Sequence, residues 1–414
     1  MTEELIDKAG QTAELIDKEK KYSAQIYKTL PVVITGGSGC YLYDIEGNGY
    51  YDFLSGYSAV NQGHVHPKIL EAFVKQAEKV TLTSRAFYTD QFPLFAEYVT
   101  QLFGYEKVLM MNTGAEAVET AIKIGRKWGY KAKNIPVNSG LLVVADGCFH
   151  GRTTAAISLS TDPVCYEDFG PYLPGIIHIP YNDLNAFKEV CEINGPHIYG
   201  FLVESIQGEA GVIIPDEGYL KKCFDLCNTH QILMMVDEIQ TMSRTGKLLC
   251  CQWDNIHPDV VILGKALSGG MMPISCVLTD DSVMKYMTEG THGSTWGGNP
   301  LASATAMAAL KVIVDENLCA NAVDRGQQLL SFLLLLKMNF PNIIKDVRGK
   351  GLLCALELHD DAWDFCLALK DNGLLARPTH GNIVRLSPPL IITDVQLEEA
   401  CTLIYNTLVG KPCA

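Results

Sequence analysis

The sequence predicts an α/β protein: a large domain with a mostly parallel sheet covered by helices, and a small α/β domain. Continuous apolar runs alternate with helical segments from about residue 65, which is typical of parallel strands buried on both faces. The chain has 414 residues, of which 48% are hydrophobic, enough for more than one core. We expect an N-terminal segment at 1–57, a large domain at 58–305 and a C-terminal part at 306–414, the first and last together forming the small domain.

The N-terminal segment begins with mixed acidic and basic residues at 1–21, which predict a charged surface helix or a partly ordered arm. The glycine-rich run 36–39 has no strand before it and no helix after it, so we expect a loop there. Two aromatic-rich runs flank the turn sequence Gly47-Asn48-Gly49, which predicts a hairpin over 39–54.

The large domain is expected to alternate helices and strands. Apolar residues at helical spacing predict helices over 67–80 and 114–130. Short apolar runs predict strands over 107–112, 141–146, 199–205, 232–238 and 260–265. After about residue 306 the pattern indicates two helices, a turn at 347–353, a strand and a last helix, as expected for part of a smaller α/β domain.

Composition argues against several classes of partner. The formal net charge of −14 disfavours nucleic acid and anionic membranes, which both require basic patches. Apolar stretches such as 332–336 are too short to span a bilayer, and residues 1–21 resemble neither a secretory signal nor a transit peptide. The 14 cysteines are scattered and lack zinc-site spacing. We therefore expect a cytoplasmic protein with reduced thiols.

Polar residues follow four of the expected strands at their carboxyl ends, where ligands bind in parallel α/β sheets. They are Asn112 to Gly114, Glu204 with Gln207, Asp237 to Gln240, and Lys265. Lys265 alone could simply mark the place where a strand reaches the surface. The alternative is an amine placed to form a Schiff base.

The other strand ends favour the second interpretation. The turn 112–117 opens a helix whose free N–H groups suit a phosphate, although an ordinary N-cap has the same sequence. Asp237 ends an apolar run and needs a cationic partner, either a nearby arginine or a protonated pyridine nitrogen. Together with Lys265 these features predict pyridoxal phosphate.

Long motifs carry a resemblance to a known family. The chain resembles the class III, fold-type-I aminotransferases in NTGAEA (112–117), DEIQ (237–240), LGKALSGG (263–270) and HGSTWGGNP (292–300). Within that class it is similar to the ornithine aminotransferases over nearly its full length, including 53–67 and QGEAGV (207–212). In this family the histidines of GHVHP lie on a connecting loop, so we expect no metal site at His64 and His66.

The resemblance implies a cofactor site for pyridoxal phosphate. Lys265 would hold the cofactor and move the proton, Asp237 would pair with the pyridine nitrogen, and Gln240 would bind the phenolic oxygen. Phe149 and Ile239 would cover the two ring faces. The expected phosphate and turn residues are Thr113, Gly114, Ala115, Ser294 and Thr295. Thr295 would come from the neighbouring subunit, which implies at least a homodimer with shared sites.

The resemblance also implies a substrate site. Arg152 would bind one carboxylate and Arg385 a second one. Glu209 would pair with Arg385 while ornithine is bound and swing away for glutamate. Tyr27 and Tyr57 would line the pocket, although tyrosines are also ordinary core residues.

Four positions depart from the family pattern. Residues 240–246 form a segment one residue shorter than usual and lack a glycine, which leaves the place of Arg244 open. Ser205 replaces a proline, His150 stands where several ornithine enzymes have tryptophan, and Trp296 replaces a tyrosine.

The expected reaction moves the δ-amino group of L-ornithine to 2-oxoglutarate, which gives glutamate 5-semialdehyde and glutamate. Alternatives are the same chemistry on N-acetylornithine, 4-aminobutyrate or another ω-amine, a pyridoxal phosphate aminomutase, and a non-catalytic binding protein. Neither nucleic acid nor membrane is expected as a partner.

Overall fold

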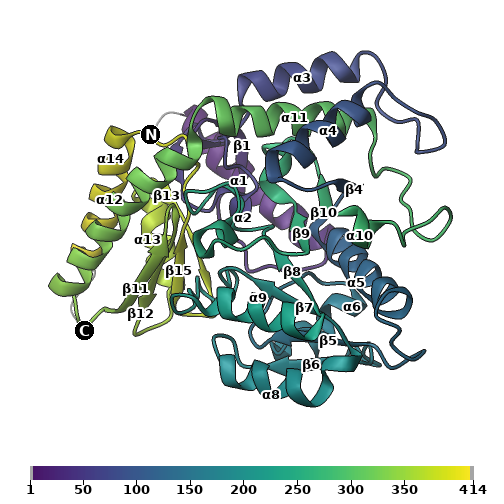
Figure 1. Cartoon of the computed structure of the whole chain (residues 1–414). Coiled ribbons are helices and arrows are strands. Elements are labelled where there is room, and N and C mark those ends of the chain that lie inside the picture. Colours follow the sequence, from purple (N-terminus) through teal and green to yellow (C-terminus); the bar gives the residue numbers. More distant parts are fainter. Residues whose placement is uncertain (1–2, 411–414) are drawn as a thin grey trace.

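A seven-stranded sheet forms the centre of the molecule in the computed structural model, which describes residues 3–410 and side chains from residue 10 (Figure 1). Its strands are β4 (Lys107–Met111), β5 (Leu141–Ala145), β6 (Ile176–Ile179), β7 (Ile198–Glu204), β8 (Leu233–Asp237), β9 (Val260–Leu263) and β10 (Ser275–Thr279). The order is β4-β10-β9-β8-β7-β5-β6, and only the pairs that β10 makes are antiparallel. Because β7 is buried along its whole length, its sequence is a continuous apolar run. The predicted α/β class is confirmed.

Helices cover both faces of this sheet. They are α3 (Pro67–Ala77), α4 (Gln91–Phe103), α5 (Gly114–Lys131), α6 (Thr154–Ile157), α7 (Pro163–Tyr166), α8 (Leu184–Asn194), α9 (Tyr219–His230), α10 (Asp281–Met284) and α11 (Pro300–Asp315), with short 3₁₀ turns η1 (Gly195–His197), η2 (Cys250–Asp254) and η3 (Lys265–Ser268). Alternate strand residues point to opposite faces. Leu202 and Met235 pack in the cluster that contains α5, whereas Phe201 and Met234 pack in the cluster that contains α8 and α9.

Two four-stranded sheets and five helices make up the rest of the regular structure within residues 3–410. The order β1-β2-β3-β13 joins β1 (Ile34–Ser38), β2 (Tyr41–Asp44) and β3 (Gly49–Asp52) to β13 (Leu374–Leu375). The order β11-β12-β15-β14 joins β11 (Ile344–Lys350), β12 (Leu353–Leu358), β14 (Arg377–Thr379) and β15 (Ile383–Leu386). The remaining helices are α1 (Glu3–Tyr22), α2 (Ser55–Ser58), α12 (Leu318–Asn339), α13 (Trp363–Asp371) and α14 (Asp394–Val409).

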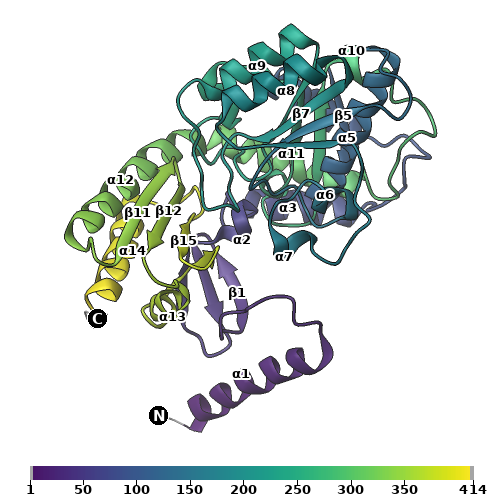
Figure 2. The same ribbon diagram turned by 90° about the horizontal axis from the view of Figure 1, so that it is seen from below.

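The N-terminal predictions are largely confirmed. Strands β2 and β3 pair antiparallel around the Gly47 turn, as the hairpin prediction requires. Helix α1 corresponds to the predicted surface helix, and residues 1–2 lie outside the described part. Figure 2 shows α1 lying apart from the body, and Thr12 Oγ1 donates to Glu46 Oε1 at 2.8 Å.

Two local predictions were wrong. Most of the glycine-rich run 36–39 lies in strand β1. Glycine has a low intrinsic preference for strands, but hydrogen bonding with β2 stabilises the extended backbone here. The expected turn at 347–353 is mainly strand: β11 continues to Lys350 and β12 starts at Leu353. Only Gly351 and Leu352 turn, and a Cβ at Gly351 would lie 2.5 Å from the carbonyl oxygen of Arg244.

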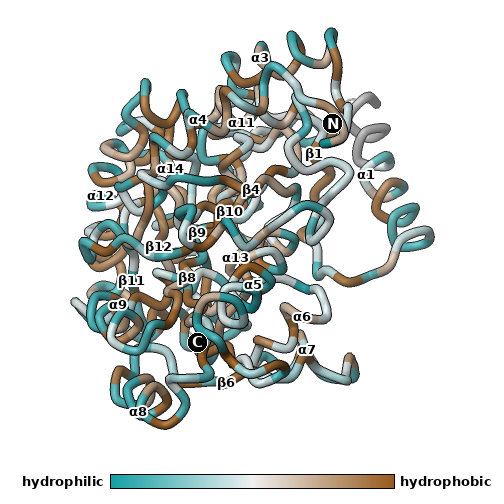
Figure 3. The backbone as a smooth tube through the Cα atoms, turned by 45° about the vertical axis from the view of Figure 1, so that its right-hand side comes forward, coloured by the Kyte–Doolittle hydropathy of each residue, from teal (hydrophilic) through white to brown (hydrophobic). Residues whose placement is uncertain are grey.

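Strand β13 pairs with β3, so the N-terminal and C-terminal parts share one sheet, as a common small domain requires. Helix α11 runs across the expected boundary at 305/306, and the division into 1–57, 58–305 and 306–414 stays a prediction. Surface helices such as α1 alternate between hydrophilic and hydrophobic residues (Figure 3). Within residues 3–410, no helix combines the length and the apolar character needed to cross a membrane.

Candidate active site

Lys265 is separated from the end of β9 by Gly264 alone, and its backbone has a φ of +45°, a conformation that side-chain-bearing residues rarely adopt. Its Nζ lies 5.8 Å from the centre of the Tyr57 ring and makes no hydrogen bond or ion pair with any described residue. Burial, helped by the charge of Arg385, lowers the pKa of Lys265 to about 8. A partly buried amine with no hydrogen-bond partner and a lowered pKa has the properties that a nucleophilic lysine needs.

Asp237 ends β8 beside this lysine and is buried. Its Oδ1 accepts from the Ile239 N–H at 3.0 Å, and its Oδ2 lies 2.8 Å from His150 Nδ1. The residue that contacts the Asp237 carboxylate is therefore a histidine and not the arginine considered from the sequence. Burial lowers the pKa of His150, but Cys148 and the bond with Asp237 outweigh it and raise that pKa well above its usual value. The His150 Nε2 has no hydrogen-bond partner among the described residues.

Glu204 at the end of β7 has a role that the sequence did not reveal. Its Oε2 accepts from the Phe149 N–H at 3.1 Å and its Oε1 from the Gly208 N–H at 3.4 Å. Burial raises its pKa to about 7, against the opposing charge of His150. One buried carboxyl group thus ties together two loops of the site. Strand-end position was the only signal in the sequence.

The start of α5 is open toward the site. Thr113 and Glu116 form a capping box: Thr113 Oγ1 accepts from the Glu116 N–H at 3.2 Å, and Glu116 Oε2 accepts from the Thr113 N–H at 2.8 Å. The N–H groups of Gly114 and Ala115 have no acceptor among the described residues. The N-cap is thus present and does not use the N–H groups of Gly114 and Ala115, so the anion site at this helix start stays a prediction that the capping box does not oppose.

The segment 292–300 reaches this helix start. Asn112 Nδ2 donates to Ser294 Oγ at 2.9 Å, which places Ser294 beside the open amides. Thr295 and Trp296 are exposed, and half of the Trp296 surface is accessible. Exposure of Thr295 in the single chain is compatible with its predicted role in a neighbouring subunit.

Ile239 and Phe149 occupy two sides of the region between these groups. Ile239 packs so closely on the helix start that a Cβ at Gly114 would lie 3.0 Å from Ile239 Cδ1. The exposed guanidinium of Arg152 lies 5.7 Å from the centre of the Phe149 ring. A cavity of about 310 Å³ borders Phe149 and Glu209.

Arg385 on β15 is buried and held by three neutral acceptors. It donates from Nη2 to Ser58 Oγ at 2.7 Å, from Nε to Ser387 Oγ at 3.1 Å and from Nη1 to Gln240 Oε1. Burial lowers its pKa to about 10, against the opposing charge of Glu209. The expected Glu209–Arg385 ion pair is not formed in this structure, because these three acceptors surround the guanidinium. The Gln240 Nε2 remains available as a donor.

The two candidate tyrosines behave differently. Residues 55–58 form a left-handed turn in which all four φ angles are positive, and Tyr57 lies on it facing Lys265. Such a turn is strained for non-glycine residues, which is typical of functional sites. Tyr27 is 70% exposed, so the single chain does not place it in the pocket as expected.

The shortened segment after Gln240 is firmly held. Arg244 is fully buried: its Nη1 donates to the carbonyl oxygens of Leu352 at 2.7 Å and Pro388 at 2.8 Å, and its Nε donates to Asn61 Oδ1 at 3.1 Å. Ser205 Oγ, in place of proline, donates to Glu238 Oε1 at 2.8 Å.

The two histidines of the connecting loop face separate carboxylates. His64 Nε2 lies 2.7 Å from Asp52 Oδ2, and His66 Nε2 lies 3.3 Å from Glu316 Oε2.

The residues present fit pyridoxal phosphate. Open amides at a helix start suit its phosphate, a buried carboxylate suits its ring nitrogen, and a free amine with a lowered pKa suits its aldehyde. These groups come from loops at the carboxyl ends of β4, β8 and β9, the edge at which the sequence predicted them (Figure 1).

Comparisons with known proteins agree with this geometry. The family model of class-III aminotransferases matches residues 22–408. "Ornithine aminotransferase, mitochondrial" from rice is 54% identical over 402 residues, covering 95% of this chain and 85% of the relative. The Toxoplasma gondii ornithine aminotransferase crystal structure superposes with a TM-score of 0.94 at 44% identity, covering 96% of this chain and 95% of that one.

A further solved structure, the acetylornithine aminotransferase from Elizabethkingia anophelis, has a TM-score of 0.89 at 48% identity and covers 97% of this chain and 99% of that one. Family match, fold and site chemistry lead to one conclusion: the chain belongs to the class-III aminotransferase family, whose members depend on pyridoxal phosphate.

Proposed function

We propose that the protein is an ornithine δ-aminotransferase that uses 2-oxoglutarate as the amino acceptor. The observation that carries the chemistry is the unpaired Lys265 amine, whose pKa is lowered to about 8 by burial and by Arg385. The choice of ornithine is supported by the rice and Toxoplasma gondii relatives, which carry that name. Products of the forward reaction would be glutamate 5-semialdehyde and glutamate.

The cofactor would be held by residues already described. Asp237 would bind the ring nitrogen, Gln240 Nε2 the phenolic oxygen, and the open amides of Gly114 and Ala115 the phosphate. Bound pyridoxal phosphate supplies an electron sink for the carbon that loses its proton. Lys265 would move that proton, since a neutral amine near pH 8 can accept it and return it.

The substrate would be oriented by its carboxylates. Arg152 is exposed beside Phe149 and would bind the α-carboxylate of ornithine, which directs the δ-amine to the cofactor. Arg385 would bind the α-carboxylate of glutamate or 2-oxoglutarate. Glu209 makes no ion pair with Arg385 in this structure, but its charge acts on that guanidinium. During the ornithine step Glu209 would pair with Arg385 and so keep it from binding a carboxylate.

We also propose a homodimer with shared sites. Exposed apolar side chains support it, because Phe87 is 69% and Tyr88 95% exposed and a second copy would cover them. Thr295 and Tyr27 would then complete the partner's site. The compartment stays a prediction: the composition suggests the cytoplasm, whereas the rice relative is named mitochondrial.

The test is the change in cofactor absorbance when one amine at a time is added to the holoenzyme without an oxo acid. Loss of the visible band with L-ornithine is the expected result. Loss only with N-acetylornithine would favour the second candidate, which the Elizabethkingia anophelis structure and His150 support. Turnover without 2-oxoglutarate would instead indicate an aminomutase.

A further inference from the structure

The segment 207–212 carries Glu209 and has an unusual backbone. The Gln207 N–H donates to the Ile213 carbonyl at 3.1 Å and the reverse bond measures 3.0 Å, which closes the segment into a loop. Val212 has a φ of +58°, a genuine outlier for a β-branched residue. A strained loop of this kind persists only where its surroundings hold it.

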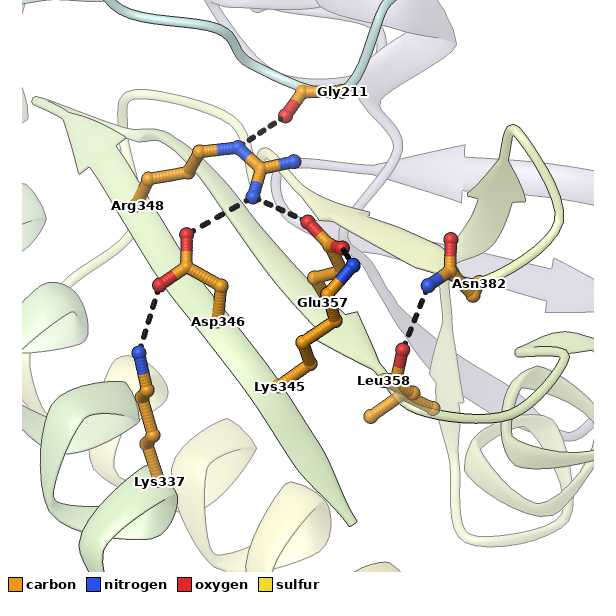
Figure 4. A network of polar contacts seen from close by, with 8 residues as sticks. All are labelled: Gly211, Lys337, Lys345, Asp346, Arg348, Glu357, Leu358 and Asn382. Atoms are coloured by element: carbon orange, nitrogen blue, oxygen red, sulfur yellow. Dashed lines mark hydrogen bonds and ion pairs between the residues drawn. The ribbon is translucent and has the colours of Figure 1, made fainter. Parts of the chain in front are cut away.

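Arg348 on β11 supplies one such hold (Figure 4). Its Nε donates to the Gly211 carbonyl oxygen at 2.8 Å, two residues after Glu209. The contact is close, because a Cβ at Gly211 would lie 3.1 Å from Arg348 Nη2 and 2.6 Å from Ile383 Cδ1. A side chain at Gly211 would therefore clash with Ile383 and crowd this arginine.

The guanidinium is itself fixed by its own sheet. Arg348 Nη1 donates to Glu357 Oε2 at 2.7 Å and to Asp346 Oδ2 at 3.1 Å. Lys345 binds the other oxygen of Glu357 at 2.6 Å, and Lys337 binds the other oxygen of Asp346 at 2.8 Å. Arg348 and Glu357 expose less than a fifth of their side chains, so this central pair is shielded from water, whereas the flanking lysines and Asp346 are more exposed.

Thr379 on β14 provides a second hold, since its Oγ1 donates to the Glu209 carbonyl oxygen at 2.7 Å. The backbone is thus bound at 209 and at 211 to strands of the C-terminal part. The side chain of Glu209, in contrast, borders the cavity of about 310 Å³ that Phe149 and His380 also line. The backbone is held while the carboxylate has room to move.

We propose that Arg348 is a positioning residue for substrate selection. It holds the backbone of 207–212, so that the Glu209 carboxylate moves as a side chain between this cavity and Arg385 without the loop moving. This inference rests on the proposed function, in which masking of Arg385 separates ornithine from glutamate.

The first test is amide hydrogen exchange of residues 207–213 in the holoenzyme, compared between wild type, R348Q and K345M. Lys345 touches Glu357 but not Gly211, so K345M is the matched control. We expect exchange about fivefold or more faster in R348Q and unchanged in K345M. If residues 207–213 exchanged at the same rate in R348Q as in the wild type, the inference would be overturned. If R348Q does not fold, R348K, which keeps a charge between the carboxylates, takes its place.

The second test compares the two half-reactions on the same preparations. R348Q is expected to slow the reaction with ornithine about tenfold and that with glutamate less than threefold, roughly the effect of losing a supporting contact. An equal fall in both would mean a structural role only and would overturn the inference. If the wild type does not react with ornithine, the proposed function fails, while hydrogen exchange still decides the role of Arg348.

Discussion

His150 Nδ1 lies 2.8 Å from Asp237 Oδ2, across 87 residues of sequence. This contact gives the buried carboxylate at the end of β8 a donor besides the Ile239 N–H. A carboxylate oriented in this way is what a protonated ring nitrogen would need. His150, which stands where several ornithine enzymes have tryptophan, thus lies beside the carboxylate proposed to bind the cofactor.

Replacing His150 by phenylalanine should slow the half-reaction with ornithine about 10- to 100-fold, the usual effect of losing a partner that orients a binding group. The KM for ornithine should change little, because the hydrogen-bond partner of His150 is Asp237 and not Arg152 or Arg385, the arginines proposed to bind the substrate. Stopped-flow absorbance measures both quantities. H150N retains an N–H donor near the position of Nδ1 and should recover part of the rate. Equal rates in H150F and H150N would contradict the hydrogen bond as the cause.

The lowered pKa of Lys265 predicts a pH dependence for cofactor loading. Below about pH 8 the amine is protonated and cannot attack the aldehyde, and above it the neutral form predominates. Loading of the cofactor-free protein, followed by absorbance, should therefore speed up with a midpoint near pH 8. A midpoint near the ordinary lysine value of about 10.4 would contradict a buried amine.

The same shift has a consequence for stability. In the unfolded chain the lysine has its ordinary pKa, so between about pH 8 and pH 10 the unfolded state binds more protons than the folded one. The free energy of unfolding of the cofactor-free protein should rise across this window from the lysine contribution and be flat below it. K265M, which cannot titrate, is the control for that contribution.

Arg244 should be a major contributor to stability. Burial, with the charge of Arg385, lowers its pKa to about 9, yet each of its three guanidinium nitrogens donates to a carbonyl or amide oxygen. R244M would leave the buried carbonyl oxygens of Leu352 and Pro388 unpaired, at a cost of about 3 kcal/mol or more. Urea unfolding of the holoenzyme measures it.

The matched control is R325M, which removes an ion pair with the exposed Asp394 and should cost less than about 1 kcal/mol. Equal losses in R244M and R325M would contradict the role assigned to the buried arginine.

Much of the fold could be predicted because buried parallel strands have continuous apolar sequences, as in β7 and β9. Strand β1 could not be predicted from the sequence, because its glycines do not favour a strand and adopt one through pairing with β2. The polar strand ends predicted where the candidate site lies, but the His150–Asp237 contact depends on how two segments far apart in the sequence approach each other. Arg244 likewise depends on carbonyl groups more than 100 residues away.

Shared active sites predict complementation between two inactive variants. K265A lacks the amine, and T295E would place a carboxylate against the phosphate of the neighbouring site. In a mixed dimer, one site combines the Lys265 of the T295E subunit with the Thr295 of the K265A subunit and is intact, while the other site carries both changes. With random pairing, half of the dimers are mixed and each has one intact site of its two. Co-expression should therefore restore about one quarter of wild-type activity. T291E, a change at another exposed threonine of the same segment, should stay active and controls for damage to the loop. Activity no higher than that of the two parents would mean that each subunit builds its site alone, and the exposed Thr295 would then need another role.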